Sequence, residues 1–221
     1  MSGIVAFVGG GEFEQTEALD RDLLAWTGAT EVLVLPTADA FERPQRAVER
    51  AVAWFEALGT SARGVDLLRR PDASSPPVLE ALRAARLIYL VGDSPMHLRS
   101  VLKDTPAWDE LAAAAGADGR AVAAAGPAAM ALCDPMTDPR GGAFTLGLGL
   151  VRPLAVVPAA DSWSHDRLHR TLKLAGAFPV VTLPTGSALV SHDGEWSCRG
   201  EVTIHLDGRV ADVDVLPPPG A

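Results

Sequence analysis

Cysteine is scarce in this sequence, which has two cysteines among 221 residues, Cys133 and Cys198. Two isolated cysteines exclude a disulfide scaffold and fit a reducing compartment. Long apolar runs are missing as well, since none reaches the roughly 18 residues that cross a bilayer. The N-terminal stretch MSGIVAFVGGGEFE has no basic residue before its apolar run, which argues against a signal peptide. We therefore expect a cytoplasmic protein that does not associate with membranes.

Positively charged residues are also few relative to negatively charged ones. Lysine and arginine total 19 against 28 aspartates and glutamates, which gives a net charge of −9. This balance argues against a nucleic-acid groove and against binding to an anionic membrane surface. Hydrophobic residues make up 48% of the chain, enough for a sizeable core in one domain. We expect a single domain over residues 1–221, with a loose proline-rich tail at 216–221.

Short apolar runs that stop at glycine or proline alternate with amphipathic stretches. Continuous apolar strands are typical of a parallel sheet that is covered on both faces. The alternation predicts a doubly wound α/β fold with a mainly parallel sheet and helices on both faces. The expected strands are Ile4–Val8, Val32–Leu35, Leu87–Val91, Ala121–Ala125 and Leu154–Val157. The expected helices include Pro44–Leu58, Val78–Ala85, Met96–Leu102 and Trp108–Ala115.

The pattern changes near residue 180, where the apolar runs become shorter. They are separated by the dipeptides Thr185-Gly186, Asp193-Gly194 and Asp207-Gly208. Such dipeptides favour tight turns between antiparallel strands. The C-terminal part is therefore predicted to form an antiparallel hairpin extension of the sheet.

Ligands of open α/β sheets bind beyond the carboxyl ends of the strands, and several distinctive segments fall there. Four stretches resemble the dipeptidase E and cyanophycinase family of serine peptidases: VGGGEFEQTEALDRDLL, LIYLVGDSPMHLRSVLKDTPAW, AMALCDPMTDPRGGAFTLGLGLV and DSWSHDRLHRTL. The likeness runs from about residue 4 to residue 206. It implies a class I glutamine-amidotransferase-like α/β fold. It also implies a serine on a strand-to-helix elbow, a histidine and an acidic residue.

The elbow of this sequence departs from the family pattern, which normally reads Gly-x-Ser-Ala-Gly-Ala-Met. The serine position falls on Gly126, or on Ala128 if a gap is allowed, and neither residue has a nucleophilic atom. No serine occurs between Ser100 and Ser162. Pro127 has no N–H, although the residue after the nucleophile normally donates one to the oxyanion. The resemblance therefore implies a lost nucleophile.

The other members of the implied triad are also affected. The resemblance implies a histidine between a proline that follows the GLGLV strand and an Asp-x-Trp. In this sequence those landmarks are Pro158 and Asp161-Ser162-Trp163, and Ala159 and Ala160 occupy the candidate positions. His165 is the nearest histidine, in the predicted first turn of the next helix. The acid could be Asp134 or Asp138, and without partners neither makes a catalytic argument.

Further pocket candidates each have a structural alternative. Gly10 and Gly11 could bind an anion through their N–H groups or form a tight turn. Asp93 follows Gly92 where the family has a second glycine. It either disfavours acidic substrates, serves a new ligand or, as we favour, caps a helix. The remaining candidates are Ser94, His97 as a base or a hydrogen-bonding core residue, Arg140 as a carboxylate partner or salt bridge, Asp161 and Trp163.

Two functional hypotheses follow. In the first, the chain has lost its serine and histidine and binds an unidentified small molecule or short peptide. In the second, it is a hydrolase whose nucleophile has moved to Cys133, Ser94 or Ser162, or which activates water directly. His165 and His169 share a helix face, but no third ligand accompanies them. We therefore expect neither a metal nor a cofactor.

We predict that the chain forms a two-fold dimer. Such dimers are the commonest oligomers of soluble proteins, and the family resemblance points the same way. Light scattering at tens of micromolar should return twice the monomer mass. The monomer mass at that concentration would refute the prediction.

Overall fold

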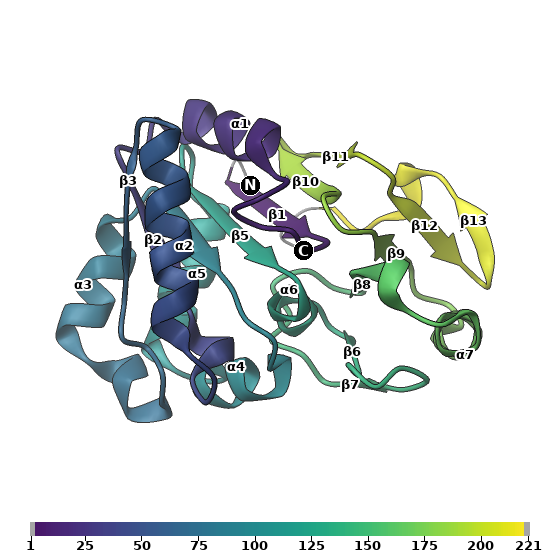
Figure 1. Cartoon of the computed structure of the whole chain (residues 1–221). Helices are drawn as coiled ribbons and strands as arrows, with labels where there is room; N and C mark the ends of the chain where they lie inside the picture. Colours follow the sequence, from purple (N-terminus) through teal and green to yellow (C-terminus); the bar gives the residue numbers. More distant parts are fainter. Residues whose placement is uncertain (1–2, 219–221) are drawn as a thin grey trace.

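A seven-stranded sheet forms the centre of the molecule. The computed structural model describes residues 3–218, and its main sheet has the order β11-β10-β1-β5-β4-β2-β3 (Figure 1). Ala6 of β1 pairs in parallel with Ala123 of β5 and antiparallel with Val190 of β10. The five mutually parallel strands are β1 (Ile4–Val8), β2 (Glu31–Leu35), β3 (Ser61–Gly64), β4 (Leu87–Leu90) and β5 (Ala121–Ala125). The two antiparallel strands are β10 (Ala188–His192) and β11 (Glu195–Arg199).

Helices cover both faces of this sheet, as the sequence predicts. Along β1, the side chains of Ile4, Ala6 and Val8 join one core, while Val5 and Phe7 join the other. A strand buried on both faces must be apolar throughout, which explains the unbroken IVAFV run. The first core packs against α1 (Glu17–Thr27) and α2 (Pro44–Ala57). The second packs against α3 (Pro76–Ala84), α4 (Pro95–Leu102), α5 (Pro106–Gly116) and α6 (Pro127–Leu132).

A second, four-stranded sheet lies beside the first, on the right in Figure 1. β8 and β9 are parallel, and the hairpin of β12 and β13 adds to β9. A two-stranded ribbon of β6 and β7 and the helix α7 complete this part of the molecule. The elements are β6 (Met136–Thr137), β7 (Phe144–Thr145), β8 (Ala155–Pro158), α7 (His165–Ala175), β9 (Val180–Leu183), β12 (Thr203–Leu206) and β13 (Arg209–Ala211).

Two of the three predicted C-terminal hairpins are present. Asp193-Gly194 joins β10 to β11, and Asp207-Gly208 joins β12 to β13. All four residues have positive φ, as a type I′ turn requires. The Thr185-Gly186 prediction is wrong, because β9 and β10 lie in different sheets. That turn is instead a crossing point, where the Gly186 N–H donates to the Gly10 carbonyl at 2.9 Å.

Two further features differ from the sequence prediction. β3 reads SARG and was not expected, because an edge strand exposed to solvent has no apolar run to reveal it. The expected loose tail is wrong for its first residues, since Leu216 is buried and the Pro217 carbonyl accepts a 2.7 Å hydrogen bond from Trp196 Nε1. Residues 219–221 of that tail lie outside the described residues. Among residues 3–218, no helix combines the length and apolarity needed to cross a membrane.

A buried carboxylate lies between α1, α2 and β4. Asp20 is fully buried, and its Oδ2 accepts hydrogen bonds from Thr16 Oγ1 at 2.7 Å and Trp54 Nε1 at 2.9 Å. Its Oδ1 and the buried Tyr89 hydroxyl have no hydrogen-bond partner among the described residues. Burial raises the pKa of Asp20 to about 6, although the hydrogen bonds from Thr16 and Trp54 oppose the shift. The charged form is therefore disfavoured in the folded state.

We predict that Asp20→Asn increases stability at pH 8. Asp20 has a pKa of about 6 in the folded state, against an ordinary value of 3.8. Its stabilising contribution is thus complete below pH 4 and is lost as pH rises through 6. An asparagine keeps the acceptor for Thr16 and Trp54 and carries no charge. The expected gain at pH 8 is about 1–3 kcal/mol, since one pKa unit corresponds to about 1.4 kcal/mol.

Urea unfolding at several pH values between 4 and 8 measures this effect. The wild type should lose stability across that range relative to Asp20→Asn. Parallel stability profiles for the two proteins would contradict the prediction.

Candidate functional site

The predicted elbow is a sharp strand-to-helix turn made by one glycine. β5 ends at Ala125 and α6 begins at Pro127, so Gly126 alone reverses the chain. Gly126 has φ 55° and ψ −143°, a conformation that other residues adopt only under strain, as at nucleophile elbows. A Cβ built at this position would meet no atom within 4 Å. Ala128, the alternative position, lies inside α6 and is fully buried.

The end of β1 holds the elbow and the loop after β8 together. The Gly126 N–H donates to the Val8 carbonyl at 3.0 Å, and the Ala159 N–H donates to the Gly9 carbonyl at 2.5 Å. Ala159 has φ 46° and ψ 43°, a left-handed conformation that costs free energy for a residue with a Cβ. Gly126 and Ala159 therefore bond to consecutive residues of one strand end. This is the arrangement that a nucleophile and its base would need.

Backbone donors surround the same point. The amide N–H groups of Gly10 and Gly11 have no hydrogen-bond acceptor among the described residues. Both glycines have positive φ, which leaves their amides at the carboxyl edge of the sheet after β1. Pro127 contributes no N–H. Gly10 and Gly11 therefore keep amide donors without acceptors among the described residues, while Pro127 has no N–H to donate.

The structure gives the candidate bases and acids other partners. His97 on α4 has its Nε2 2.9 Å from the Leu68 carbonyl, so that nitrogen carries the proton. His165 is exposed on α7, with its ring stacked on that of His169 at 6.1 Å. Asp134 Oδ1 accepts from the Gly147 N–H at 3.0 Å. None of these contacts connects a base to the elbow.

Three predicted pocket residues belong to the second-sheet region instead. Asp138 and Arg140 form an exposed ion pair at 2.8 Å, whose hydrogen bonds lower the pKa of Asp138. Asp161 accepts from the N–H and hydroxyl of Thr185, at 2.8 and 3.1 Å. Buried Trp163 packs beneath the guanidinium of Arg167, 3.5 Å from its ring centre. Each of these residues has a structural contact that accounts for its position.

The relocated nucleophiles also have contacts that oppose reactivity. Cys133 is fully buried, and burial together with the nearby Asp134 charge raises the pKa of its thiol far above the usual range. Ser162 Oγ donates to the Ala159 carbonyl at 2.7 Å. Ser94 is half-buried at the start of α4, where its side chain caps no N–H. Within residues 3–218, no three His, Cys, Asp or Glu side chains are grouped to hold a metal ion.

A charged cleft lies at the carboxyl edge of the main sheet, where Asp39 follows β2 and Asp93 follows β4. Its volume is about 570 Å³, and both acidic and basic side chains line it. Asp93 enters the cleft from the loop after β4, the strand that neighbours β5. The predicted helix cap at Asp93 is wrong, because Ser94 occupies the N-cap position of α4. The lining residues are Asp39, Glu42, Arg43, Arg46, Ala47, Arg50 and Asp93.

The floor of the cleft is held by a close contact between two loops. The Asp93 N–H donates to Asp39 Oδ1 at 2.9 Å, and the Ser94 N–H donates to the Ala38 carbonyl at 3.0 Å. Gly92 has φ 121°, and a Cβ there would lie 2.5 Å from the Asp39 nitrogen. Glycine is therefore required at position 92, for reasons of backbone conformation and of space.

Burial shifts the pKa values of two acidic side chains that follow strands of the main sheet. Burial raises the pKa of Asp39, and the neighbouring charges of Asp93 and Glu42 add to the shift. Burial likewise raises the pKa of Glu12, which follows β1, while Arg50 opposes the shift. Arg50 donates to the Glu12 carbonyl at 2.9 Å and pairs with Glu14 at 3.4 Å.

Sequence reasoning identified Asp93 and missed the rest of the cleft. Asp39 follows β2 as Asp93 follows β4, so its place at the carboxyl edge was available from the strand pattern. Arg46 and Arg50 are four residues apart on one face of α2, and Arg43 immediately precedes this helix. This spacing could have predicted from the sequence that the arginines lie close together.

Comparisons with known proteins agree with this geometry. Residues 5–198 match the model of peptidase family S51. A peptidase from an acI-B1 Actinobacterium has a similar structure, with a TM-score of 0.80 and 24% identity over 99% of this chain and 93% of that one. A peptidase E-type protein from Listeria monocytogenes EGD-e is also similar in structure, with a TM-score of 0.68 and 16% identity. That match covers 90% of this chain and 98% of the Listeria chain. Among curated proteins the sequence finds no match.

The fold is thus that of the α/β peptidases related to peptidase E. The chain belongs to peptidase family S51. The family resemblance predicted from the four sequence segments is confirmed.

We predict that Gly126→Ala destabilises the fold less than Gly92→Ala. An alanine at 126 meets no neighbour and bears only the strain of its φ, about 1–2 kcal/mol. An alanine at 92 bears similar strain and also a clash with the backbone of Asp39. Urea unfolding of both variants measures the difference. Equal losses, or a larger loss for Gly126→Ala, would show that the elbow has no room for a side chain.

Proposed function

We propose that this chain does not hydrolyse peptides through a serine acyl-enzyme. It keeps the scaffold of peptidase family S51 and binds a small molecule or short peptide at the carboxyl edge of its main sheet. The observation that carries the proposal is the elbow itself, where Gly126 stands in the strained turn between β5 and α6. The position has the backbone of a nucleophile elbow and no side-chain oxygen.

Three parts of the usual machinery are lacking together. Acyl transfer by serine needs a hydroxyl, a base within hydrogen-bond reach and donors for the oxyanion. Gly126 supplies no hydroxyl, Ala159 and Ala160 supply no imidazole, and Pro127 supplies no N–H. One oxyanion donor alone is worth about 10²–10³ in kcat. Triad members act as a unit, so their losses cannot be offset singly.

Relocation of the nucleophile is less well supported than its loss. The thiol of Cys133 is buried and held neutral, and the hydroxyl of Ser162 is engaged by the Ala159 carbonyl. Ser94 has no base among its hydrogen-bond partners. A binding role is favoured because the cleft at the carboxyl edge of the main sheet has a volume of about 570 Å³ and is lined by charged side chains. Pockets of this size hold small ligands in other proteins.

The test is labelling with a serine-directed fluorophosphonate together with an assay on aspartyl dipeptides. We expect no labelled serine and no cleavage at neutral pH. Stoichiometric labelling of any serine, or turnover of a dipeptide, would overturn the proposal.

Rebuilding the missing groups gives a sharper form of the test. Gly126→Ser alone should stay inactive, because it restores the oxygen without a base or the elbow donor. The combined variant Gly126→Ser, Pro127→Ala and Ala159→His restores all three. Ala160→His in place of Ala159→His is the second choice for the base, and Gly126→Ser alone is the control for both combinations. Activity of the single variant near that of the combined one would show that another residue, such as His165 or His97, serves as the base.

A further inference from the structure

The charged cleft separates its two signs of charge. Arg43 and Arg46 of α2 form no ion pair within residues 3–218, and neither do Asp39, Glu42 and Asp93. Arg50 is the one lining arginine that is paired, and its partners Glu12 and Glu14 lie outside the lining. Unpaired groups of both signs therefore face one cavity of about 570 Å³.

We infer that this cleft binds a small ligand that carries both a carboxylate and a cationic group. The carboxylate lies against Arg43 and Arg46, and the cation lies against Asp39 and Asp93. A dipeptide with a basic first residue has this chemistry. The inference rests on the proposed binding function and names the class of ligand for the same site.

The acidic half of the cleft is built into the backbone. Asp39 Oδ1 accepts the Asp93 N–H at 2.9 Å, which holds the two loops and both carboxyl groups at one place. Asp39 is half-buried and Asp93 is exposed, so a ligand can reach both. Burial is the main cause of the raised pKa of Asp39, the charges of Asp93 and Glu42 add to it, and the Asp93 N–H and the Arg50 charge oppose it. A ligand cation would supply the missing charge, and an acidic side chain would be repelled.

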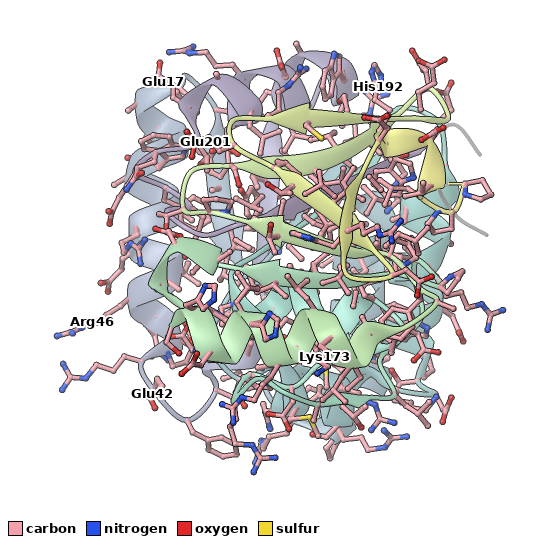
Figure 2. The ribbon with its side chains drawn as sticks, turned by 90° about the vertical axis from the view of Figure 1, so that its right-hand side faces the viewer. Glu17, Glu42, Arg46, Lys173, His192 and Glu201 are labelled. Atoms are coloured by element: carbon pink, nitrogen blue, oxygen red, sulfur yellow. The ribbon has the colours of Figure 1, made fainter. Side chains whose placement is uncertain are left out.

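The basic half is carried by one helix. Arg43 precedes α2 and Arg46 lies in its first turn, so their side chains leave the chain close together. Glu42 and Arg46 lie at the same margin of the molecule in Figure 2, with Arg46 extended into solvent. A free guanidinium can take a carboxylate in a bidentate pair. The helix position and the extended side chain together allow the arginines to close over a ligand from outside.

The test is titration calorimetry of the full chain with four dipeptide probes: Lys-Ala, its C-terminal amide, norleucyl-Ala and Asp-Ala. Lys-Ala should bind with a Kd at or below about 1 mM. The amide and Asp-Ala should each bind at least about 10-fold more weakly, the expected effect of losing or opposing one charge-assisted contact. Norleucyl-Ala should lie between Lys-Ala and Asp-Ala. Equal affinity for Lys-Ala and Asp-Ala, equal affinity for Lys-Ala and its amide, or no binding of Lys-Ala would overturn the inference.

Substitutions test separately which residues bind the carboxylate of the ligand and which bind its cationic group. Arg43→Gln combined with Arg46→Gln should weaken Lys-Ala about 10-fold and leave the amide unchanged. Asp93→Asn should remove the preference for Lys-Ala over Asp-Ala. Arg21→Gln is the control, because Arg21 is an exposed arginine of α1 whose partner is Glu17. It should alter none of the affinities, whereas a matching loss in this control would show a non-specific charge effect and refute the assignment.

Mass spectrometry of the recovered peptides separates this inference from the proposed function. Intact peptides with the expected order of affinities support both. Cleaved peptides with that order support the ligand class and overturn the non-hydrolytic function. Intact peptides without that order overturn the ligand class alone.

Discussion

The end of β1 is the point on which the site depends. Consecutive carbonyls there accept N–H groups from the two loops that matter, Val8 from Gly126 and Gly9 from Ala159. These bonds hold a strained turn at each donor, with positive φ at both. Strain of this kind persists only where surrounding contacts fix the backbone. The sheet therefore imposes the elbow whether or not a nucleophile occupies it.

This dependence explains how the elbow forms around a residue that has no side chain. Backbone hydrogen bonds position Gly126, so removal of a side chain leaves the turn intact and relieves the strain that a Cβ would bear. Pro127 suits the first turn of a helix, where its missing N–H costs no intrahelical bond. The same proline is unsuited to oxyanion binding. Local stability and catalysis thus place opposite demands on this position, and the sequence meets the first.

The carboxyl edge of the main sheet carries charged side chains, and Gly126 at the elbow has no nucleophilic atom. Asp93 stands where the family resemblance implies a glycine, and its N–H still makes the contact to Asp39 that a glycine could make. The substitution changes the electrostatics of the cleft without changing the loop. Burial then raises the pKa values of Asp39 and Glu12, and Arg50 offsets part of that effect.

Much of the fold could be predicted because burial on both faces gives strands an unmistakable apolar run, as in Ile4–Val8. β3 lacked that signal because it lies at an edge of the sheet. The order at Leu216 and Pro217 was not predicted, because Trp196, which donates to the Pro217 carbonyl, is remote in sequence. The elbow position was readable from the family pattern. Of the cleft, only Asp93 was predicted from the sequence, because the arginines of the cleft belong to no recognised motif. The pairing of Asp161 with Thr185 needs the contact between η3 (Ala160–Ser162) and the turn after β9, which no local pattern encodes.

Incubation of the wild-type chain with Asp-Ala and Lys-Ala in ¹⁸O-labelled water tests the central claim most directly. Hydrolysis by any route, through an acyl-enzyme or by direct attack of water, places ¹⁸O in the carboxylate of the released first residue. We expect both dipeptides to be recovered intact, with no labelled aspartate or lysine above the buffer control. Labelled aspartate or lysine that accumulates in proportion to the concentration of the protein would contradict the claim that this chain binds without hydrolysing.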